Sequence, residues 1–522
     1  MNRTNGILPT LVKSLMRPEI FDHAVDNIQL IETHISWVIL TGRYVYKLKK
    51  PLNLGFLDFS TLDKRRFYCE EEVRLNRRLA PTIYLSVVVF HGTVENPSLS
   101  GNNEILEYAV KMKQFPQDAQ MDRMLQQGEL NPHQIDELAK LIAQFHQQIE
   151  TADDKSHYGD LQHVYSPVEE NFKQIRERKV DVKYYQTLIE LERWSKSTYH
   201  DLSSILVQRK QDGFIRECHG DMHLRNLAWY QNQPIAFDCL EFNANLRWID
   251  VISEVAFLIM DLHDKKQYHL AQRFLNTYLQ ATGDYSGLEV LRYYLVYRAL
   301  VRAKVNAIRL HQEGLTPEEK VNVEKEFEGY LQLAKTYTQK LVPQLIITRG
   351  MSASGKSTLT QPILERLGAI RIRSDMERKR LFNIEDNKHA EDGIGHGIYS
   401  TKASQQTYQR LYELANVVID AGYSVIVDAV FLNVEQRKPF ERLSMEKGIP
   451  YNILEFFASE KTLRNRIIKR ELDISDADLS VLEDQLKKWK PLEQDECKFH
   501  IEVNTEIQVD IDSLVQRINI TM

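Results

Sequence analysis

The sequence predicts two domains of different class: an α+β domain over residues 1–340, then an α/β domain with a parallel five-stranded sheet over residues 343–522. Three observations support this prediction. A chain of 522 residues exceeds what one hydrophobic core usually organises. The first part begins with hairpin-like sequence and continues with a long helical region, whereas the last third alternates short apolar runs with helix-prone segments. A charged stretch gives way to an apolar run near Pro343, which marks the boundary.

Composition narrows the class of protein. Hydrophobic residues make up 43% of the chain and charged residues 27%, as in ordinary soluble globular proteins. No apolar stretch has the length needed to cross a bilayer, and Met1–Pro18 carries no signal-peptide pattern. The four cysteines form no CxxC pair, which favours a reducing cytoplasm. A formal charge of −6 gives no general attraction to nucleic acid. We therefore expect a cytoplasmic protein without a membrane partner.

The first domain is expected to have two lobes. The sequence predicts two strands, Ile35–Leu40 and Arg43–Lys49, joined by a Thr41-Gly42 turn. A helical region follows from about Asn131 to Val207. This order predicts a β-rich small lobe followed by an α-rich large lobe.

The second domain is expected to consist of βαβ units. Helix-prone segments separate its apolar runs, for example Lys356–Leu367, which Gly368 ends at a C-cap position. Such alternation predicts parallel strands. The candidate strands are Leu345–Thr348, Ala369–Arg373, Ser424–Ala429, Asn452–Phe457 and His500–Val503.

A phosphate-binding motif follows the first of these strands. Residues 350–357, with the sequence GMSASGKS, match GxxxxGK[ST], in which backbone N–H groups and a helix N-terminus cradle phosphates. Lys356 would meet the β- and γ-phosphates, and the Ser357 hydroxyl would bind Mg²⁺. A plain glycine turn is the alternative, but the motif lies between a predicted strand and a predicted helix. The predicted nucleotide-binding residues are Gly350, Ser352, Ala353, Ser354, Gly355, Lys356, Ser357 and Thr358.

Two aspartates end later strands of this domain. Asp428 closes the apolar run Val425–Val427 and is predicted to be a second Mg²⁺ ligand. Asp375 follows another strand, at the end where α/β folds place ligands, and could accept a proton from a substrate hydroxyl. The alternative for Asp375 is a helix N-cap.

Arginines further along could stabilise a transferring phosphoryl group. Arg464, Arg466 and Arg470 recur at near-helical spacing, although a basic helix face in solvent would look the same. Together with Gly350–Thr358 and the Arg-Ser-Asp sequence ending at Asp375, they resemble the small P-loop kinases of the zeta-toxin, polynucleotide-kinase and gluconate-kinase type. The resemblance covers Pro343 to the C-terminus. It implies that Asp375 faces the substrate hydroxyl and that Arg466 and Arg470 close on the phosphates.

The first domain carries a second catalytic motif. Residues 219–226, with the sequence HGDMHLRN, match HGDxxxxN, a variant of the kinase catalytic loop. Its spacing presents Asp221 to a substrate hydroxyl and turns Asn226 back toward a metal. Asp238 follows 12 residues after Asn226, and residues 227–237 between them can form a hairpin. That hairpin would bring Asn226 and Asp238 together as metal ligands.

Two lysines are candidates for the phosphate-binding lysine of this domain. Strand alternation puts Lys47 and Lys49 on one face, and we favour Lys47 because it ends the more apolar run. Its carboxylate partner is predicted to be Glu72, since Leu75 and Leu79 place it beside a buried helix stripe. Ordinary surface charges are the alternative for each.

These residues resemble the aminoglycoside-phosphotransferase and choline-kinase branch of the protein-kinase-like fold, from about Ile28 to Asp261. Two departures are visible: Cys239-Leu240 replaces Phe-Gly, and only Thr41-Gly42 stands where a GxGxxG loop is usual. The whole tandem, including Lys49–Ser60, resembles bacterial proteins that fuse an aminoglycoside-phosphotransferase-like domain to an AAA-type predicted kinase. The resemblance implies Asp221 as base, Asn226 and Asp238 as metal ligands, Lys47 with Glu72 at the phosphates, and Asp250 as a brace of the catalytic loop.

The sequence thus predicts a protein-kinase-like bilobal α+β domain followed by an α/β P-loop kinase domain. We expect ATP or GTP with Mg²⁺ at each site and transfer of the γ-phosphate to a hydroxyl of a small molecule. Two other functions stay open: a regulatory protein whose kinase-like half only binds a ligand, and a nucleic-acid end kinase, suggested by the basic residues of 371–380 and 464–470. The acceptor, the choice of nucleotide and the oligomeric state stay open as well.

Overall fold

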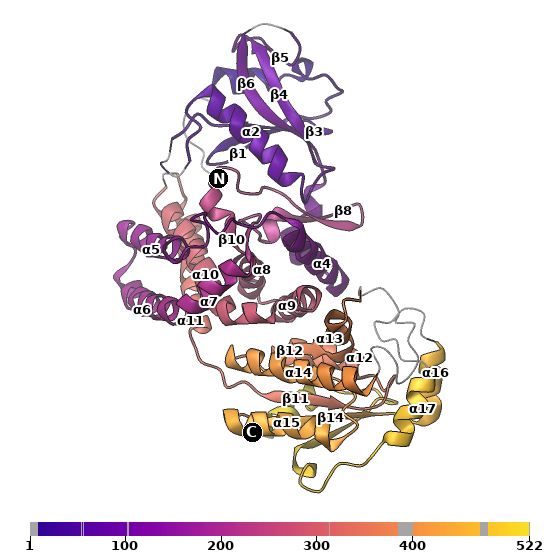
Figure 1. Ribbon diagram of the computed structural model, residues 1–522. Helices are drawn as coiled ribbons and strands as arrows, with labels where there is room; N and C mark the ends of the chain where they lie inside the picture. Colours follow the sequence, from indigo (N-terminus) through magenta and orange to yellow (C-terminus); the bar gives the residue numbers. More distant parts are fainter. Residues whose placement is uncertain are drawn as a thin grey trace. The chain divides into compact units, whose positions relative to one another are not determined.

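A computed structural model describes residues 9–53, 55, 57–101, 104–312, 314–384, 400–469 and 479–520. The chain forms two compact units (Figure 1). The first unit comprises Met1–Lys266 with Val290–Thr338, and the second comprises Gln267–Glu289 with Gln339–Met522. The segment Gln267–Glu289 therefore packs with the second unit, although it lies within the range 1–340 predicted for the first domain.

The small lobe of the first unit is built on one sheet with the strand order β1-β2-β3-β6-β4-β5, in which every pair is antiparallel. Its elements are α1 (Thr10–Ser14), η1 (Pro18–Ile20), β1 (Gln29–Glu32), β2 (Ser36–Leu40), β3 (Tyr44–Lys49), α2 (Leu62–Asn76), β4 (Tyr84–Gly92), β5 (Pro97–Ser98) and β6 (Ile105–Lys113). The predicted hairpin is present as β2 and β3. Cys69 and Val73 of α2 pack against Tyr84, Tyr108 and Val110 of the sheet, so this helix covers one sheet face (Figure 1).

The large lobe of the first unit is mostly helical, as predicted. Its helices are η2 (Gln117–Ala119), α3 (Met121–Gln127), α4 (Pro132–Gln148), α5 (Leu161–Glu177), η3 (Val182–Tyr184), α6 (Tyr185–Asp201), α7 (Ser203–Gln211), η4 (Leu224–Asn226), η5 (Ala244–Leu246), α8 (Val251–Asp264), α10 (Leu288–Leu310) and α11 (Pro317–Tyr337). Its strands are β7 (Ile215–Glu217), β8 (Leu227–Tyr230), β9 (Gln233–Ala236) and β10 (Trp248–Asp250). Helix α8 is buried from Val251 to Leu262 and lies at the centre of the lobe. Among the described helices, none is long and apolar enough to cross a membrane.

The second unit contains a parallel sheet with the strand order β12-β13-β11-β14-β15. Its strands are β11 (Leu345–Arg349), β12 (Ile370–Arg373), β13 (Val425–Asp428), β14 (Tyr451–Phe457) and β15 (His500–Asn504), so all five predicted strands are present. The helices are α9 (Tyr268–Thr282), η6 (Tyr285–Gly287), α12 (Lys356–Leu367), α13 (Ser374–Leu381), α14 (Thr401–Asp420), α15 (Val434–Lys447), α16 (Glu460–Ile468), α17 (Leu479–Lys488), η8 (Cys497–Phe499) and α18 (Ile511–Ile520). The carboxyl ends of β11, β12 and β13 meet at one sheet edge, where ligands bind in such folds.

Helix α9 covers the edge of this sheet, which explains its place in the second unit. The Asn276 side chain accepts a hydrogen bond from the Arg371 backbone N–H at 2.7 Å and donates to the Ala369 carbonyl at 3.1 Å. Gln272 donates to the same carbonyl at 2.8 Å. These amides satisfy backbone groups of edge strand β12 that a neighbouring strand would otherwise pair.

Candidate active sites

The catalytic loop of the first unit lies between β7 and β8. Asn226 Nδ2 donates to the Asp221 backbone carbonyl at 2.9 Å and to Asp221 Oδ2 at 3.0 Å. The Asp221 side chain is 33% exposed, so a substrate hydroxyl can reach it. Burial alone would raise the pKa of Asp221, but His223, His219 and Arg302 hold that pKa well below its usual value. Asp221 is therefore an ionised acceptor at neutral pH.

A buried glutamate on α8 holds this loop. Glu254 Oε1 accepts hydrogen bonds from the His219 backbone N–H at 3.1 Å and from His146 Nε2 at 3.0 Å, and Oε2 accepts from Gly220 N–H at 2.6 Å. Burial would raise the pKa of Glu254, yet these partners lower it to about 2. Asp261 adds a bond from the Leu224 N–H at 2.9 Å.

Asp250 has a different role from the one that the family resemblance implied. Its carboxylate pairs with Arg209 at 2.6 and 2.8 Å and accepts the Ile252 N–H at the start of α8. The catalytic loop is held instead by Glu254 and Asp261. The available signal was that Glu254 lies inside the most apolar run of the chain, Ile249–Met260, and that Asp261 directly follows it, in a position where a charge needs a specific partner.

His146, Cys218 and Glu254 lie close enough together to suggest a metal site. Both Glu254 oxygens are already engaged by the loop N–H groups and by His146. Burial also raises the pKa of Cys218 well above its usual value, so this sulfur stays a thiol. We therefore regard the cluster as support for the catalytic loop.

The β8–β9 hairpin brings the two predicted metal ligands together. Its register pairs Leu227 with Ala236, and the Phe237 N–H donates to the Asn226 carbonyl at 3.0 Å. Asp238 follows at once, with a left-handed φ of 64° and its N–H donated to Tyr84 OH at 3.1 Å. Its side chain is 50% exposed. Asn226 and Asp238 thus offer an amide and a carboxylate at one end of the hairpin, and Mg²⁺ prefers such oxygen ligands.

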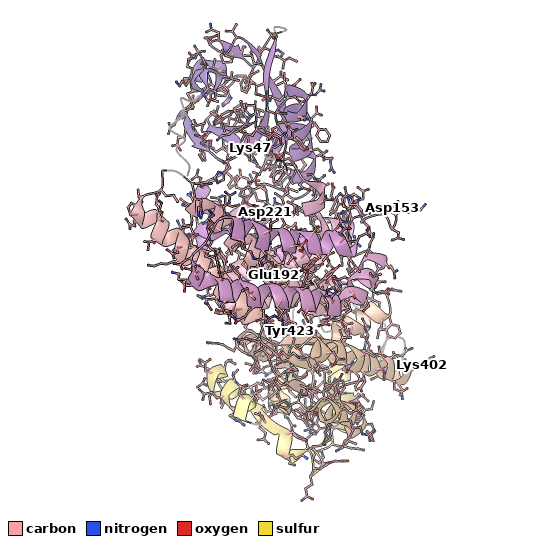
Figure 2. The ribbon with its side chains drawn as sticks, turned by 90° about the vertical axis from the view of Figure 1, so that its left-hand side faces the viewer. Lys47, Asp153, Glu192, Asp221, Lys402 and Tyr423 are labelled. Atoms are coloured by element: carbon pink, nitrogen blue, oxygen red, sulfur yellow. The ribbon has the colours of Figure 1, made fainter. Side chains whose placement is uncertain are left out.

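Both candidate lysines contact Glu72. Lys47 Nζ lies 2.8 Å from Glu72 Oε1 and 2.6 Å from Asp238 Oδ1, and Lys49 Nζ lies 2.7 Å from Glu72 Oε2. Lys49 also pairs with Glu241, a residue that no sequence motif indicates. Figure 2 shows Lys47 in the sheet-bearing lobe and Asp221 in the helical lobe of the first unit. No glycine occurs in the β1–β2 connection, Thr33–Ile35, which is closed by the Ser36 N–H donating to Thr33 Oγ1.

The phosphate-binding loop of the second unit connects β11 to α12. Lys356 Nζ donates to the carbonyls of Gly350 and Met351, each at 2.8 Å, and Ser357 Oγ donates to Asp428 Oδ2 at 2.8 Å. A Cβ at Gly350 would come within 2.4 Å of the Phe456 carbonyl, so only glycine fits this position. The predicted pair Ser357 and Asp428 thus forms a hydroxyl–carboxylate group suited to a hard cation such as Mg²⁺.

Asp375 shares a cavity with the phosphate-binding loop. This cavity has a volume of about 1030 Å³, and Lys356, Ser357, Asp375 and Asp428 all line it. Arg373, not Asp375, is the N-cap residue of α13, which counts against the capping alternative. Asp375 Oδ1 lies 3.6 Å from an Arg378 guanidinium nitrogen.

Two further side chains reach the phosphate-binding loop. Arg466 donates to the Ala353 carbonyl at 3.2 Å and to Thr505, whereas Arg464 pairs with Glu460 and Glu483. Arg470 lies outside the described residues. Gln485 of α17 accepts from the Ser352 N–H at 2.7 Å and donates to Ser352 Oγ at 2.9 Å. Sequence reasoning missed Gln485, because a lone glutamine in a charged helix gives no signal.

Known families match both units. A model of the phosphotransferase enzyme family matches residues 58–293, and an AAA domain model matches residues 345–492. An uncharacterized protein of Mycobacterium tuberculosis and one of Mycobacterium bovis are each 28% identical over 450 residues, which span 86% of this chain and 88% of the relative.

Solved structures also resemble parts of this chain. An amicoumacin kinase in complex with AMP-PNP, Ca²⁺ and Ami is 14% identical and covers 62% of this chain and 92% of its own, with a TM-score of 0.39. A Plasmodium vivax ethanolamine kinase is 10% identical and covers 61% of this chain and 86% of its own, with a TM-score of 0.37. A Sinorhizobium meliloti gluconokinase is 18% identical and covers 34% of this chain and 91% of its own, with a TM-score of 0.24.

The family matches support phosphoryl transfer as the role of the chain, and nucleotide binding with it. They fall on the parts of the chain that carry the two motifs: the catalytic loop at 219–226 lies within the first match, and the phosphate-binding loop at 350–357 lies within the second. The chain therefore joins a phosphotransferase-family domain with a kinase-like fold to an AAA-type P-loop domain with a parallel five-stranded sheet.

Proposed function

We propose that the protein is a tandem kinase in which each unit binds ATP or GTP with Mg²⁺ and transfers the γ-phosphate to a hydroxyl of a small molecule. The observation that carries the proposal is in the second unit. There the Ser357–Asp428 pair, the phosphate-loop lysine and the Asp375 carboxylate line one cavity, which is the set of groups that phosphoryl transfer needs.

In the second unit, the chain's own groups would position the reactants. Loop N–H groups and Lys356 would bind the phosphates, and Arg466 would add positive charge beside the loop. Ser357 and Asp428 would hold Mg²⁺, which neutralises phosphate charge when bound. Asp375 would orient the acceptor hydroxyl and take its proton.

In the first unit, Asp221 would orient the acceptor hydroxyl and accept its proton, and Asn226 keeps that carboxylate in place. Asn226 and Asp238 would hold the metal. Lys47, at 12% side-chain exposure, is the lysine that phosphates can reach, whereas Lys49 is fully buried. This difference in access favours Lys47 in the choice that the sequence left open.

The test is transfer of labelled γ-phosphate from ATP into a metabolite extract by the full-length protein. Lys356→Ala and Asp221→Asn disable one unit each, and the double variant disables both. We expect two labelled products in the wild type, one lost in each single variant, and none in the double variant. Labelled products that persist in the double variant would contradict the proposal.

Two observations favour a regulatory role for the first unit as a second candidate. Its β1–β2 connection has no glycine with which to cover phosphates, and Lys47 is bound to Asp238. Under this alternative, Asp221→Asn would abolish no product and would instead change the rate of the second unit.

A nucleic-acid substrate has less support. Three of the basic residues that suggested it are paired within the second unit: Arg371 donates to the Ser357 carbonyl and to Thr360, Arg380 binds Glu377, and Arg464 binds two glutamates. Guanidinium groups that are already paired bind a phosphate backbone more weakly than free ones. A binding curve for an oligonucleotide that falls steeply with salt would reverse this ranking.

A further inference from the structure

Five charged side chains of the first unit form a line in which the sign alternates. Asp238 contacts Lys47 at 2.6 Å, Lys47 contacts Glu72 at 2.8 Å, Glu72 contacts Lys49 at 2.7 Å, and Lys49 contacts Glu241. The two Glu72 oxygens are divided, Oε1 to Lys47 and Oε2 to Lys49. The usual kinase arrangement needs one lysine for this glutamate, so the second lysine requires an explanation.

The exposure of these side chains is highest at the Asp238 end of the line and close to zero at the other end. Side-chain exposure is 50% for Asp238, 12% for Lys47, and 0% for both Glu72 and Lys49, with Glu241 at 4%. A ligand can therefore meet only the Asp238–Lys47 end. Burial would lower the pKa of Lys49, but Glu241 and Glu72 raise it above its usual value, so this lysine stays charged.

Each lysine joins the same three elements. Because side chains alternate along β3, Lys47 and Lys49 lie on one face and both reach Glu72 on α2. Asp238 and Glu241 belong to the same loop after β9, three residues apart. Lys49 therefore repeats, out of reach of solvent, both connections that Lys47 makes at the open end. The Phe59 ring closes over it, with Lys49 Nζ 4.8 Å from the ring centre.

We propose that Lys49, together with Glu241, is a positioning pair that keeps α2 and the 238–241 loop docked on β3 while Lys47 and Asp238 separate to receive a nucleotide and its metal. The consequence for nucleotide rests on the proposed function of the first unit. Phosphates at Lys47 would share its charge with Glu72, and without a second lysine this fully buried carboxylate would be left with a weakened partner, which is costly. With Lys49 in place, Glu72 keeps a partner in both states.

This arrangement also separates the roles of the two lysines. Lys49 Nζ lies between two carboxylates and has no exposed surface, so it cannot be the group that meets phosphates. A purely structural ion pair would affect stability alone. A positioning pair must also affect how well the 238–241 loop is held and how well Asp238 binds a metal.

The experiment compares two double variants of the full-length protein that each remove one positive and one negative charge. Lys49→Met with Glu241→Gln breaks the buried pair and leaves Glu72 with Lys47. Lys50→Met with Glu32→Gln is the matched control, because Lys50, the next residue after Lys49, pairs with Glu32 at 2.6 Å instead of with a carboxylate of the line. Lys47→Met is the third variant. Thermal unfolding of each variant shows first that it is folded.

The first measurement is amide hydrogen exchange over α2 and residues 238–241, which needs no nucleotide. We expect exchange in both segments to become about tenfold faster in the Lys49/Glu241 variant. Exchange in Lys47→Met and in the control should stay close to that of the wild type. Equal loosening in Lys47→Met, or no loosening in the Lys49/Glu241 variant, would overturn the proposal.

The second measurement is Mg²⁺-dependent binding of a non-hydrolysable ATP analogue, with Lys356→Ala present in every protein to silence the second unit. Loss of a supporting shell around a metal ligand typically weakens binding 10–100-fold, and we expect a loss of about this size in the Lys49/Glu241 variant and none in the Lys50/Glu32 control. Lys47→Met should also weaken binding, because it removes the lysine that meets the phosphates, but without the faster hydrogen exchange. Unchanged affinity in a loosened variant would overturn the proposal. If the Lys356→Ala parent binds no nucleotide, the proposed function of the first unit fails, and hydrogen exchange alone then decides the role of Lys49.

Discussion

At the scale of single residues, buried carboxylates carry much of the organisation of the first unit. Glu254 accepts hydrogen bonds from two backbone N–H groups of the catalytic loop and from the His146 imidazole, and its side chain has no exposed surface. A group held in this way is ionised because its partners outweigh the cost of burial. Its contribution to stability must therefore depend on pH.

We predict that Glu254→Gln lowers the free energy of unfolding of the first unit by about 3 kcal/mol at neutral pH. The pKa of Glu254 is lowered to about 2 in the fold, so its stabilising contribution is present above the ordinary carboxyl pKa and is lost as pH falls toward 2. The difference between variant and wild type should therefore shrink below about pH 4. Urea unfolding followed by tryptophan fluorescence measures it, since four of the five tryptophans lie in this unit. If the difference in unfolding free energy between variant and wild type did not change with pH, Glu254 would not be the ionised carboxylate that stabilises this unit.

A second prediction at this scale concerns Lys356. Its Nζ contacts two loop carbonyls and lines the cavity, so Lys356→Ala should lower transfer by the second unit at least about 100-fold. The unfolding free energy should change by only about 1 kcal/mol, because a hydrogen bond to a neutral acceptor contributes little net stability. Transfer assays and urea unfolding of the same sample separate the two effects. Undiminished transfer would refute the P-loop assignment.

Sequence alone predicted the residues that belong to spaced motifs, such as Asp221, Asn226 and Lys356. Each has a spacing that its chemistry requires, which is visible without coordinates. Glu254, Glu241 and Gln485 are not part of any motif with a defined spacing. Each reaches its partner only because the chain folds back from a distant position, so no local pattern could identify that partner. The apolar run around Glu254 indicates only that this charge needs a partner somewhere.

At the scale of elements, α17 is placed to influence the phosphate-binding loop. Gln485 is its contact, with one hydrogen bond accepted from the Ser352 N–H and one donated to the Ser352 hydroxyl. The side chain is buried and lies among the residues that line the cavity. Charge introduced at this position would therefore act on bound phosphates at short range.

We predict that Gln485→Glu weakens nucleotide binding by the second unit about tenfold, because a carboxylate would repel phosphate groups in a poorly solvated site. Lys487→Gln is the matched control, since it changes the net charge of the same helix by the same amount at an exposed position. Calorimetric titration with a non-hydrolysable ATP analogue, with Asp238→Asn present to silence the first unit, makes the comparison. Equal effects of the two variants would show that only the overall charge matters.

The central strands of the second unit, β11, β13 and β14, were predictable as elements because a buried parallel strand is a short, mainly apolar run. The edge strands β12 and β15 instead alternate apolar and polar residues, which is also a strand pattern. The position of α9 was not predictable. Its contact with β12 depends on Asn276 and Gln272, and two amides on a helix create no periodic signal. Its packing partner becomes known only from the fold.

At the scale of the whole molecule, the two units are not consecutive in sequence. The chain leaves the first unit after Lys266, forms α9 and η6 within the second unit, returns at Val290, and enters the second unit again after Thr338. A cut between Tyr337 and Pro343, which the sequence alone would select, therefore separates α9 from the sheet that it covers. The exposed backbone groups of an uncovered edge strand invite pairing with other chains.

We predict that the fragment 343–522 is less stable and more prone to associate than the same region within the full chain, and that a peptide of residues 267–289 added in trans restores it. The three hydrogen bonds between the α9 amides and the backbone of Ala369 and Arg371 contribute about 1 kcal/mol each, so the peptide should raise the melting temperature of the fragment by roughly 10 °C at saturation. A peptide carrying Gln272→Ala and Asn276→Ala is the control and should have little effect. Differential scanning calorimetry with light scattering follows both quantities. If the fragment alone is monomeric and gains no stability from the peptide, α9 contacts β12 without stabilising the second unit. The boundary near Pro343 that the sequence predicts would then define the domain.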